Sequence, residues 1–131
     1  MTTRNGILKA NNSPVAARGL VTSTLLGPDL CHIIPLNRTV IIRKIMYWNN
    51  TGANAMLVFG TVTNVIPVAP ATFVPILPTI TAVNGFHDEV IPPEIEFTQD
   101  RAALAAGLTG SIYLMAGIAG VLVRLTVEEI A

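Results

Sequence analysis

The side chains best suited to acid–base or metal chemistry are few and scattered in this sequence. The two histidines, His32 and His87, are far apart, and the single cysteine, Cys31, precedes His32 within an apolar run. Metal sites in sequences usually show ligands at short, regular spacing, such as Cys-x-x-Cys. No such pair occurs here, so we expect neither a metal nor a cofactor. We interpret Cys31 and His32 as residues of a core or an interface.

Two acidic residues and the serines are the remaining candidates for catalysis. Glu94 and Glu96 are two positions apart, so on a strand they would share one face, as the carboxylates of glycosidases sometimes do. We favour the solvated outer face of an edge strand, which needs no chemistry. No Gly-x-Ser-x-Gly motif is present. The sequence therefore predicts a protein that is not an enzyme.

One run of aromatic and amide residues suggests ligand binding. It consists of Tyr47, Trp48, Asn49 and Asn50. On one concave face of a β-sandwich, these side chains would bind a carbohydrate or another small ligand. Such a binding module is our alternative hypothesis. Aromatic rings can also stack nucleic-acid bases, but the basic residues are too few for us to expect nucleic acid as a partner.

The elements that position these residues are predicted to be strands. β-branched and aromatic residues recur in short runs, and Gly, Pro and Asn separate the runs. The pattern amounts to about eight short strands. The β-forming runs are residues 19–26, 30–34, 39–48, 54–63, 72–77, 79–83, 89–97, 111–116 and 121–129.

Two pairs of these runs are predicted to form hairpins. An Asn-Asn-Thr-Gly turn follows residues 39–48, and residues 54–63 return as the partner strand. Near the end of the chain, residues 111–116 and 121–129 form a closing hairpin across a turn bounded by two glycines. Both predictions assume that neighbouring runs pair within one sheet.

The connections between the other runs carry weaker signals. Asn84-Gly85 marks a tight turn, and Pro92-Pro93 breaks the run over residues 89–97 because proline cannot donate to a strand ladder. Residues 98–108 are the one plausible helix, which Thr98 or Asp100 would cap. The fold therefore contains at most one short helix.

The predicted architecture is one all-β domain behind an extended arm. Residues 1–18 are polar and irregular and carry Arg4, Lys9 and Arg18 without an acidic residue, which is typical of an N-terminal arm. Residues 19–131 form a single β-sandwich. The strand number favours a jelly roll, and an immunoglobulin-like sandwich is the alternative, although its Cys–Trp–Cys signature is missing.

The composition indicates a subunit that is covered by other protein. Charged residues make up 12% of the 131 residues and hydrophobic residues 51%, whereas soluble domains are typically about 25% charged. A free monomer needs charge to stay apart from its neighbours, and a subunit buried between partners does not. The shortage of charge therefore predicts assembly.

Two long stretches contain no charge, over residues 45–86 and 102–123. The second is long enough to cross a bilayer, which needs about 20 apolar residues. Its Thr109-Gly110-Ser111 turn and repeated glycines suit strands better, so we do not expect a membrane segment. The N-terminus lacks the apolar core of a secretory signal, which favours assembly in a virion or in the cytoplasm.

The charges that are present differ in sign between the two parts of the chain. Residues 1–44 hold six basic residues and one acidic residue, a net +5, and residues 45–131 hold two basic and seven acidic residues, a net −5. The two parts can attract each other within one chain or between neighbouring copies.

An arm followed by such a strand series resembles small viral jelly-roll proteins, namely coat, cement and head-decoration subunits. The matching features are residues 1–18, with Arg4, Lys9 and Arg18, and the strand series from residue 19 to residue 129. The arm is less basic than the genome-binding arms of coat proteins, and the chain is short for a main shell protein. The resemblance therefore implies a decoration or accessory role.

These observations lead to one expected function. We expect a structural subunit that assembles with copies of itself into a trimer or ring, which sits on a larger protein shell such as a capsid. Its arm and its charge-poor faces would be buried between chains. Closed symmetric rings are the usual outcome of such contacts.

Overall fold

The computed structural model describes residues 15–25, 27–63, 72–99 and 111–130, which form two antiparallel sheets packed face to face. The predicted β-sandwich is confirmed, and no helix occurs among the described residues. The strands are β1 (Val15–Ala17), β2 (Val21–Thr22), β3 (Asp29–Ile33), β4 (Arg38–Asn49), β5 (Ala55–Thr63), β6 (Thr72–Pro75), β7 (Ile80–Ala82), β8 (Phe86–Val90), β9 (Glu96–Gln99), β10 (Ser111–Ala116) and β11 (Leu122–Ile130).

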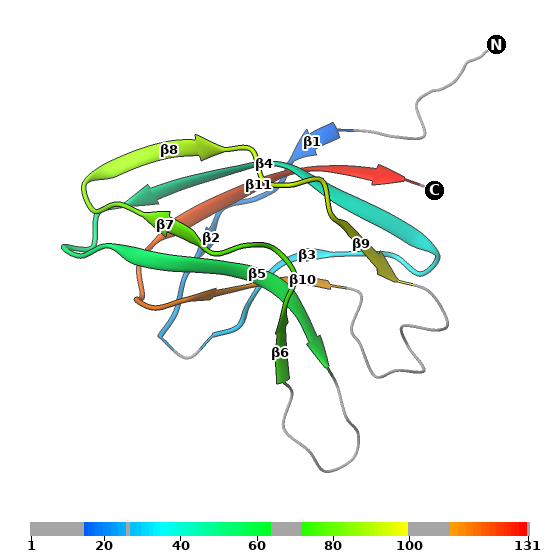
Figure 1. Cartoon of the computed structure of the whole chain (residues 1–131), viewed down its shortest axis with the longest axis horizontal. Coiled ribbons are helices and arrows are strands. Elements are labelled where there is room, and N and C mark those ends of the chain that lie inside the picture. Colours follow the sequence, from blue (N-terminus) through cyan, green and yellow to red (C-terminus); the bar gives the residue numbers. More distant parts are fainter. Residues whose placement is uncertain (1–14, 26, 64–71, 100–110, 131) are drawn as a thin grey trace.

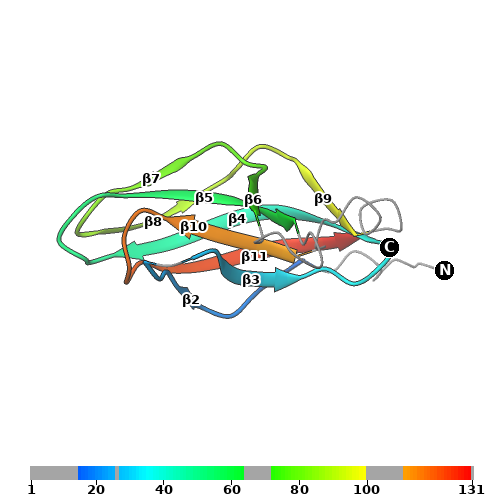
Figure 2. The same cartoon turned by 90° about the horizontal axis from the view of Figure 1, so that it is seen from below.

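Each sheet has a continuous order of paired strands (Figures 1 and 2). The first sheet runs β1-β11-β4-β8, with β2 also paired to β11 and β9 also paired to β4. The second sheet runs β3-β10-β5-β6, with β7 also paired to β5. Figure 1 shows the first sheet as the upper layer and the second as the lower layer.

The core lies between the two sheets and follows the alternation of side chains along each strand. From the first sheet it receives Val123, Leu125 and Val127 of β11, and from the second sheet Leu57 and Phe59 of β5. Burying one such side chain stabilises the fold by about 1.5–3 kcal/mol. The fully buried apolar residues are Val40, Ile45, Leu57, Phe59, Ala82, Ile112, Leu114, Val121, Val123 and Val127.

A β-bulge keeps the long strand β4 in register with the core. Thr126 pairs with Lys44 and Val127 pairs with Ile42, so Arg43 is the extra residue on β4. Ile42 and Ile45 are both buried, although a regular strand would turn them to opposite faces. The bulge allows both isoleucines to enter the core while the two basic residues between them face solvent.

Both predicted hairpins are wrong. β4 belongs to the first sheet and β5 to the second, and the same holds for β11 and β10. Each connection therefore crosses from one sheet to the other at the end of the sandwich seen on the left of Figure 1. The turn residues were recognised correctly. However, strands that each bury one face show the same alternation pattern whether they pair within one sheet or pack against one another from opposite sheets.

Two smaller predictions about connections have different outcomes. Pro92 and Pro93 do interrupt a strand, because β8 and β9 pair with successive parts of β4 on either side of them. Thr98 and Gln99 do not begin a helix, since both belong to β9 and pair with β4. The rest of the predicted helix lies outside the described residues.

Residues 15–17 of the expected arm pair with the first sheet. They form β1, and Val15 lies opposite Glu128 of β11. The backbone N–H of Arg18 then donates to the carbonyl of Leu125 at 2.8 Å. Arg4 and Lys9 lie outside the described residues.

A buried amide holds the crossing between β4 and β5 in place. Asn49 is 1% exposed, and its Nδ2 donates to the carbonyls of Ala53 at 2.9 Å and Ala82 at 2.7 Å. Its Oδ1 accepts from Thr51 N at 3.2 Å and Thr51 Oγ1 at 2.7 Å. The carbonyl of Asn49 accepts from Gly85 N at 2.7 Å, which adds the turn between β7 and β8 to the same network.

We predict that Asn49→Ala lowers the free energy of unfolding by about 2–4 kcal/mol, because it leaves buried backbone groups without partners. Urea denaturation followed by circular dichroism measures the loss. The matched control is Asn50→Ala, at an exposed neighbour, which should change stability by no more than about 0.5 kcal/mol. Equal effects of the two substitutions would contradict this role for Asn49.

Candidate functional site

The charged residues of the described chain are concentrated on one sheet. The strands of the second sheet, β3, β5, β6, β7 and β10, contain a single charged residue, Asp29. Its carboxylate accepts from Thr24 N at 2.9 Å and from Thr24 Oγ1 at 2.7 Å, so it is engaged by its own chain. The two faces of the sandwich therefore differ sharply in character.

The outer surface of the second sheet is apolar, and we call it the apolar face. Tyr113 and Met115 of β10 project outward because they alternate along the strand with Ile112 and Leu114, which are fully buried. Met115 pairs with Val58 of β5, and Tyr113 with Leu30 of β3. Met56 is 53% exposed, Leu30 45% and Met115 38%. The apolar face consists of Leu30, Ile33, Met56, Val58, Tyr113 and Met115.

Ion pairs on the outer surface of the first sheet join the basic part of the chain to the acidic part. Arg43 donates from Nε to Glu128 at 2.7 Å and also contacts Glu94. Lys44 Nζ lies 3.5 Å from Glu89. The attraction expected from the +5 and −5 segments therefore operates within one chain. Exposed pairs such as these contribute little stability.

A third ionic group lies where β3 of the second sheet meets the end of β11. His32 Nε2 is 3.6 Å from Glu129 Oε2, and Arg18 lies 3.9 Å from the same oxygen. The His32 side chain is 9% exposed, and no described residue hydrogen-bonds its Nε2. Burial and the charge of Arg18 together lower the pKa of His32, and Glu129 opposes them.

Cys31 is the extra residue in the bulge of β3, since the neighbouring pairs are Ile112 with His32 and Tyr113 with Leu30. Burial, assisted by the charge of Asp29, raises the pKa of the Cys31 thiol to about 12. A thiol with this pKa is protonated near neutral pH, whereas nucleophilic cysteines have lowered pKa values. The structure therefore favours the interpretation of Cys31 as a packing residue.

The structure does not bring the other candidates for chemistry together. Cys31 and His32 lie on β3 of the second sheet, and His87 lies on β8 of the first. No group of three His, Cys, Asp or Glu side chains with metal-binding geometry occurs in the part of the chain that the structure describes. Glu94 is paired with Arg43. Within the same residues, no helix is long and apolar enough to cross a membrane.

The four residues of the predicted ligand face point in two directions. Tyr47 and Asn49 are 4% and 1% exposed and face the core, because they alternate along β4 with Trp48. Trp48 is half-buried on the outer surface of the first sheet, and Asn50 is exposed. Only Trp48 and Asn50 present side chains that a ligand could contact.

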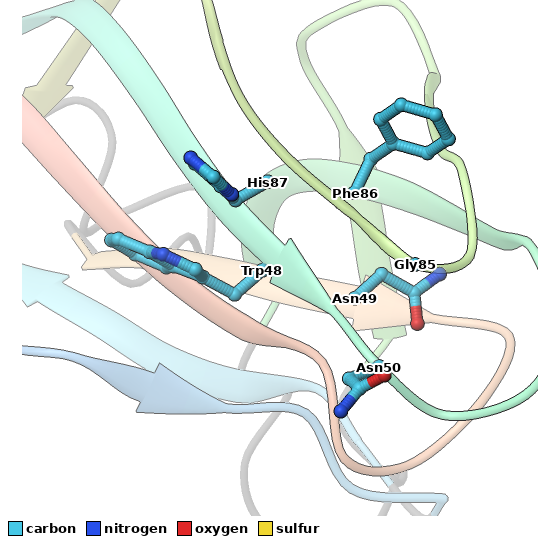
Figure 3. A pocket seen from close by; sticks show the side chains of 6 residues that line it. All are labelled: Trp48, Asn49, Asn50, Gly85, Phe86 and His87. Carbon is cyan, nitrogen blue, oxygen red and sulfur yellow. The ribbon is translucent and has the colours of Figure 1, made fainter.

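These two residues line a hollow that also includes part of β8, and we call it the Trp48 recess. Trp48 pairs with His87 across the strands (Figure 3). Met46 pairs with Glu89. One part of the recess, of about 280 Å³, is lined by Trp48, Asn49, Asn50, Gly85, Phe86 and His87. The adjoining part, of about 540 Å³, is lined by Met46, Tyr47, Trp48, His87, Asp88 and Glu89.

Sequence reasoning missed three features of these surfaces. It did not place β8 beside β4, so His87 and Phe86 were not connected with Trp48. It did not recognise Ser23, which is 2% exposed and whose Oγ donates to the carbonyl of Ile118 at 2.7 Å. It located the uncharged stretches, but it did not predict that most of their strands would lie in one sheet.

Comparison with protein families, with curated proteins and with solved structures finds no match to this chain.

The environment of His32 predicts a pH dependence of stability. Because the pKa of His32 is lowered in the folded state, the unfolded chain binds more protons in the window below about 6.5. We therefore expect the urea midpoint to fall as the pH decreases from 7 to 5. His32→Gln should reduce this slope, whereas His87→Gln, at an exposed histidine, should retain it. A slope unchanged in His32→Gln would contradict the assignment.

Proposed function

We propose that this chain is a structural subunit that assembles with copies of itself, as a capsid decoration, cement or coat-type protein. The observation that carries the proposal is the apolar face, an uncharged sheet surface with large exposed side chains. Monomeric proteins seldom expose contiguous apolar patches of this kind, and such patches usually mark contacts with other protein. The proposal assigns the chain no catalytic activity.

A second copy of this chain is the partner that we propose for the apolar face. The face offers no charge to pair with a charged partner, so a matching surface must itself be uncharged. The same face of another copy meets this requirement. Symmetric self-association is also the commonest form of assembly among soluble proteins. We propose a trimer or ring, with the arm that includes Arg4, Lys9 and Arg18 contributing further contacts.

The edges of the sheets favour assembly through faces. β1 and β2 pair with successive parts of β11, β6 and β7 with successive parts of β5, and β8 and β9 with successive parts of β4. These three interrupted edges, with Pro75, Pro92 and Pro93 near the breaks, are poor templates for a further strand. The fourth edge, β3, is continuous, but it is short and carries the bulge at Cys31, which also disfavours strand addition. Contacts between copies would therefore use side chains on the sheet surfaces.

The strand order supports the jelly-roll part of the proposal. If each interrupted edge counts as one strand, the described residues form eight strands, which pair in the orders 1-8-3-6 and 2-7-4-5. This arrangement corresponds to two interlocked Greek keys, the topology of jelly rolls. Capsid and lectin domains both use that fold, so the fold alone does not select a function.

The charge distribution favours a protein partner over packaged nucleic acid. Arg18, Arg43 and Lys44 all lie near carboxylates of their own chain. Each of these pairs reduces the positive potential that phosphate groups would meet. A role on the protein surface of a shell is consistent with this neutralised sheet.

The test is the oligomeric state of the pure protein at micromolar concentration, measured by size-exclusion chromatography with light scattering. We expect a closed oligomer. Met115→Glu and Met56→Glu should each weaken association by about 100-fold or more, because burying an unpaired carboxylate costs several kcal/mol. Circular dichroism verifies that each variant is folded.

The matched control is Ile91→Glu, which adds the same charge at a side chain that is 81% exposed and lies outside the apolar face. It should assemble as the wild type does. A wild type that stays monomeric at all accessible concentrations would overturn the proposal. So would an oligomer that Ile91→Glu dissociates and the two methionine substitutions leave intact.

A further inference from the structure

The Trp48 recess combines an aromatic platform with polar groups on the opposite side of the sandwich from the apolar face. We infer that it binds a neutral sugar unit of a glycan, a function that goes beyond self-assembly and does not depend on it.

The platform is formed by residues that adjacent strands place side by side. Trp48 of β4 lies between His87 of β8 and Leu122 of β11, its partners on the two sides. Figure 3 shows the indole and imidazole rings as neighbours above the sheet. Because β4 pairs on both sides within the first sheet, the backbone that carries the indole is firmly held. A rigid, partly exposed aromatic surface suits the apolar face of a pyranose ring, which carries C–H groups.

Polar side chains surround this platform. Asn50 borders one part of the recess, and Asp88 and Glu89 border the other, with His87 shared between them. Glu89 pairs with Met46 and lies on the same face of the sheet as Trp48, whereas Asp88 pairs with Tyr47 and lies on the other face. Amide, imidazole and carboxylate groups can donate to and accept from the hydroxyls of a sugar. Phe86 also borders the recess, but it pairs with Asn49, and its ring points away from Trp48 (Figure 3). An apolar platform with a few polar groups is the usual composition of a small-molecule site.

The charge of the recess selects among ligands that would stack on an indole. Asp88 and Glu89 are acidic, and Lys44 lies 3.5 Å from Glu89, which offsets its charge. Phosphate groups and acidic sugars would meet the Glu89 carboxylate, and no lysine or arginine is among the lining residues; the nearest cation across the sheet is Arg124 of β11, which pairs with Met46. A nucleic acid or an anionic glycan is therefore disfavoured, and a neutral glycan remains.

The shape of the recess favours a chain of sugars over a single one. Its two parts share Trp48 and His87, so this pair separates two adjoining hollows of about 280 and 540 Å³. Small-molecule sites range over roughly 300–1,000 Å³. Successive units of an oligosaccharide could occupy the two hollows, with the indole between them.

The experiment uses the fact that Trp48 is the sole tryptophan of the chain. Neutral hexasaccharides of glucose, mannose, galactose and N-acetylglucosamine are each titrated into the full-length protein while its tryptophan fluorescence is recorded. We expect at least one of them to produce a saturable change. Oligothymidylate and oligogalacturonate, which are anionic, should produce none.

Variants measured by calorimetry assign the binding to the recess. Trp48→Ala should weaken it by about tenfold or more, equivalent to about 1.4 kcal/mol, and Trp48→Phe should recover part of the loss. Ile91→Ala, outside the recess, should bind as the wild type does, and circular dichroism verifies folding. Met115→Glu should also bind normally, which separates this inference from the proposed assembly.

Three results would overturn the inference. The first is the absence of binding by all four neutral hexasaccharides. The second is binding of an anionic probe alone. The third is glycan binding that Trp48→Ala leaves unchanged.

Discussion

The fold depends on closing one end of the sandwich, where the chain crosses repeatedly between sheets. Every crossing exposes backbone groups that no strand ladder satisfies, and buried polar groups without partners are costly. Asn49 and Ser23 supply those partners from within the core. Ser23 Oγ donates to the carbonyl of Ile118 and accepts from Val121 N at 3.0 Å, and the Ser23 carbonyl accepts from Gly120 N at 2.9 Å. Asn49 supplies hydrogen-bond partners in the same way at the connection between β4 and β5 and at the turn between β7 and β8. Two polar residues therefore join the two sheets.

This constraint also sets the geometry of the Trp48 recess. Alternation along β4 turns Trp48 outward because its neighbours Tyr47 and Asn49 face the core. The carbonyl of Asn49 binds Gly85, which has a φ of +84° and begins the approach to β8. His87 and Phe86 follow directly, so the network that closes the sandwich also brings the second side of the recess beside the first.

The sequence was sufficient to predict most of the strands, the sandwich and the break at Pro92-Pro93, because these follow from local periodicity and turn chemistry. It was not sufficient to predict which strands pair. The alternation of buried and exposed residues is the same whether two strands pair in one sheet or face each other across the core, and only long-range contacts distinguish the two arrangements. The prediction that four residues share one ligand face was wrong for a related reason. Tyr47, Trp48, Asn49 and Asn50 are adjacent in sequence, and adjacency on a strand places side chains on opposite faces.

The two sheets divide the surface in a way that the composition alone could not reveal. A low overall charge is compatible with charges spread thinly over the whole surface, but here the first sheet carries nearly all the described charges and pairs many of them internally. The second sheet carries the exposed methionines instead. Three of the four sheet edges are interrupted and the fourth, β3, is bulged, which disfavours strand addition. Contacts through the apolar face would therefore leave the opposite sheet, with the Trp48 recess, open to solvent and available to a ligand.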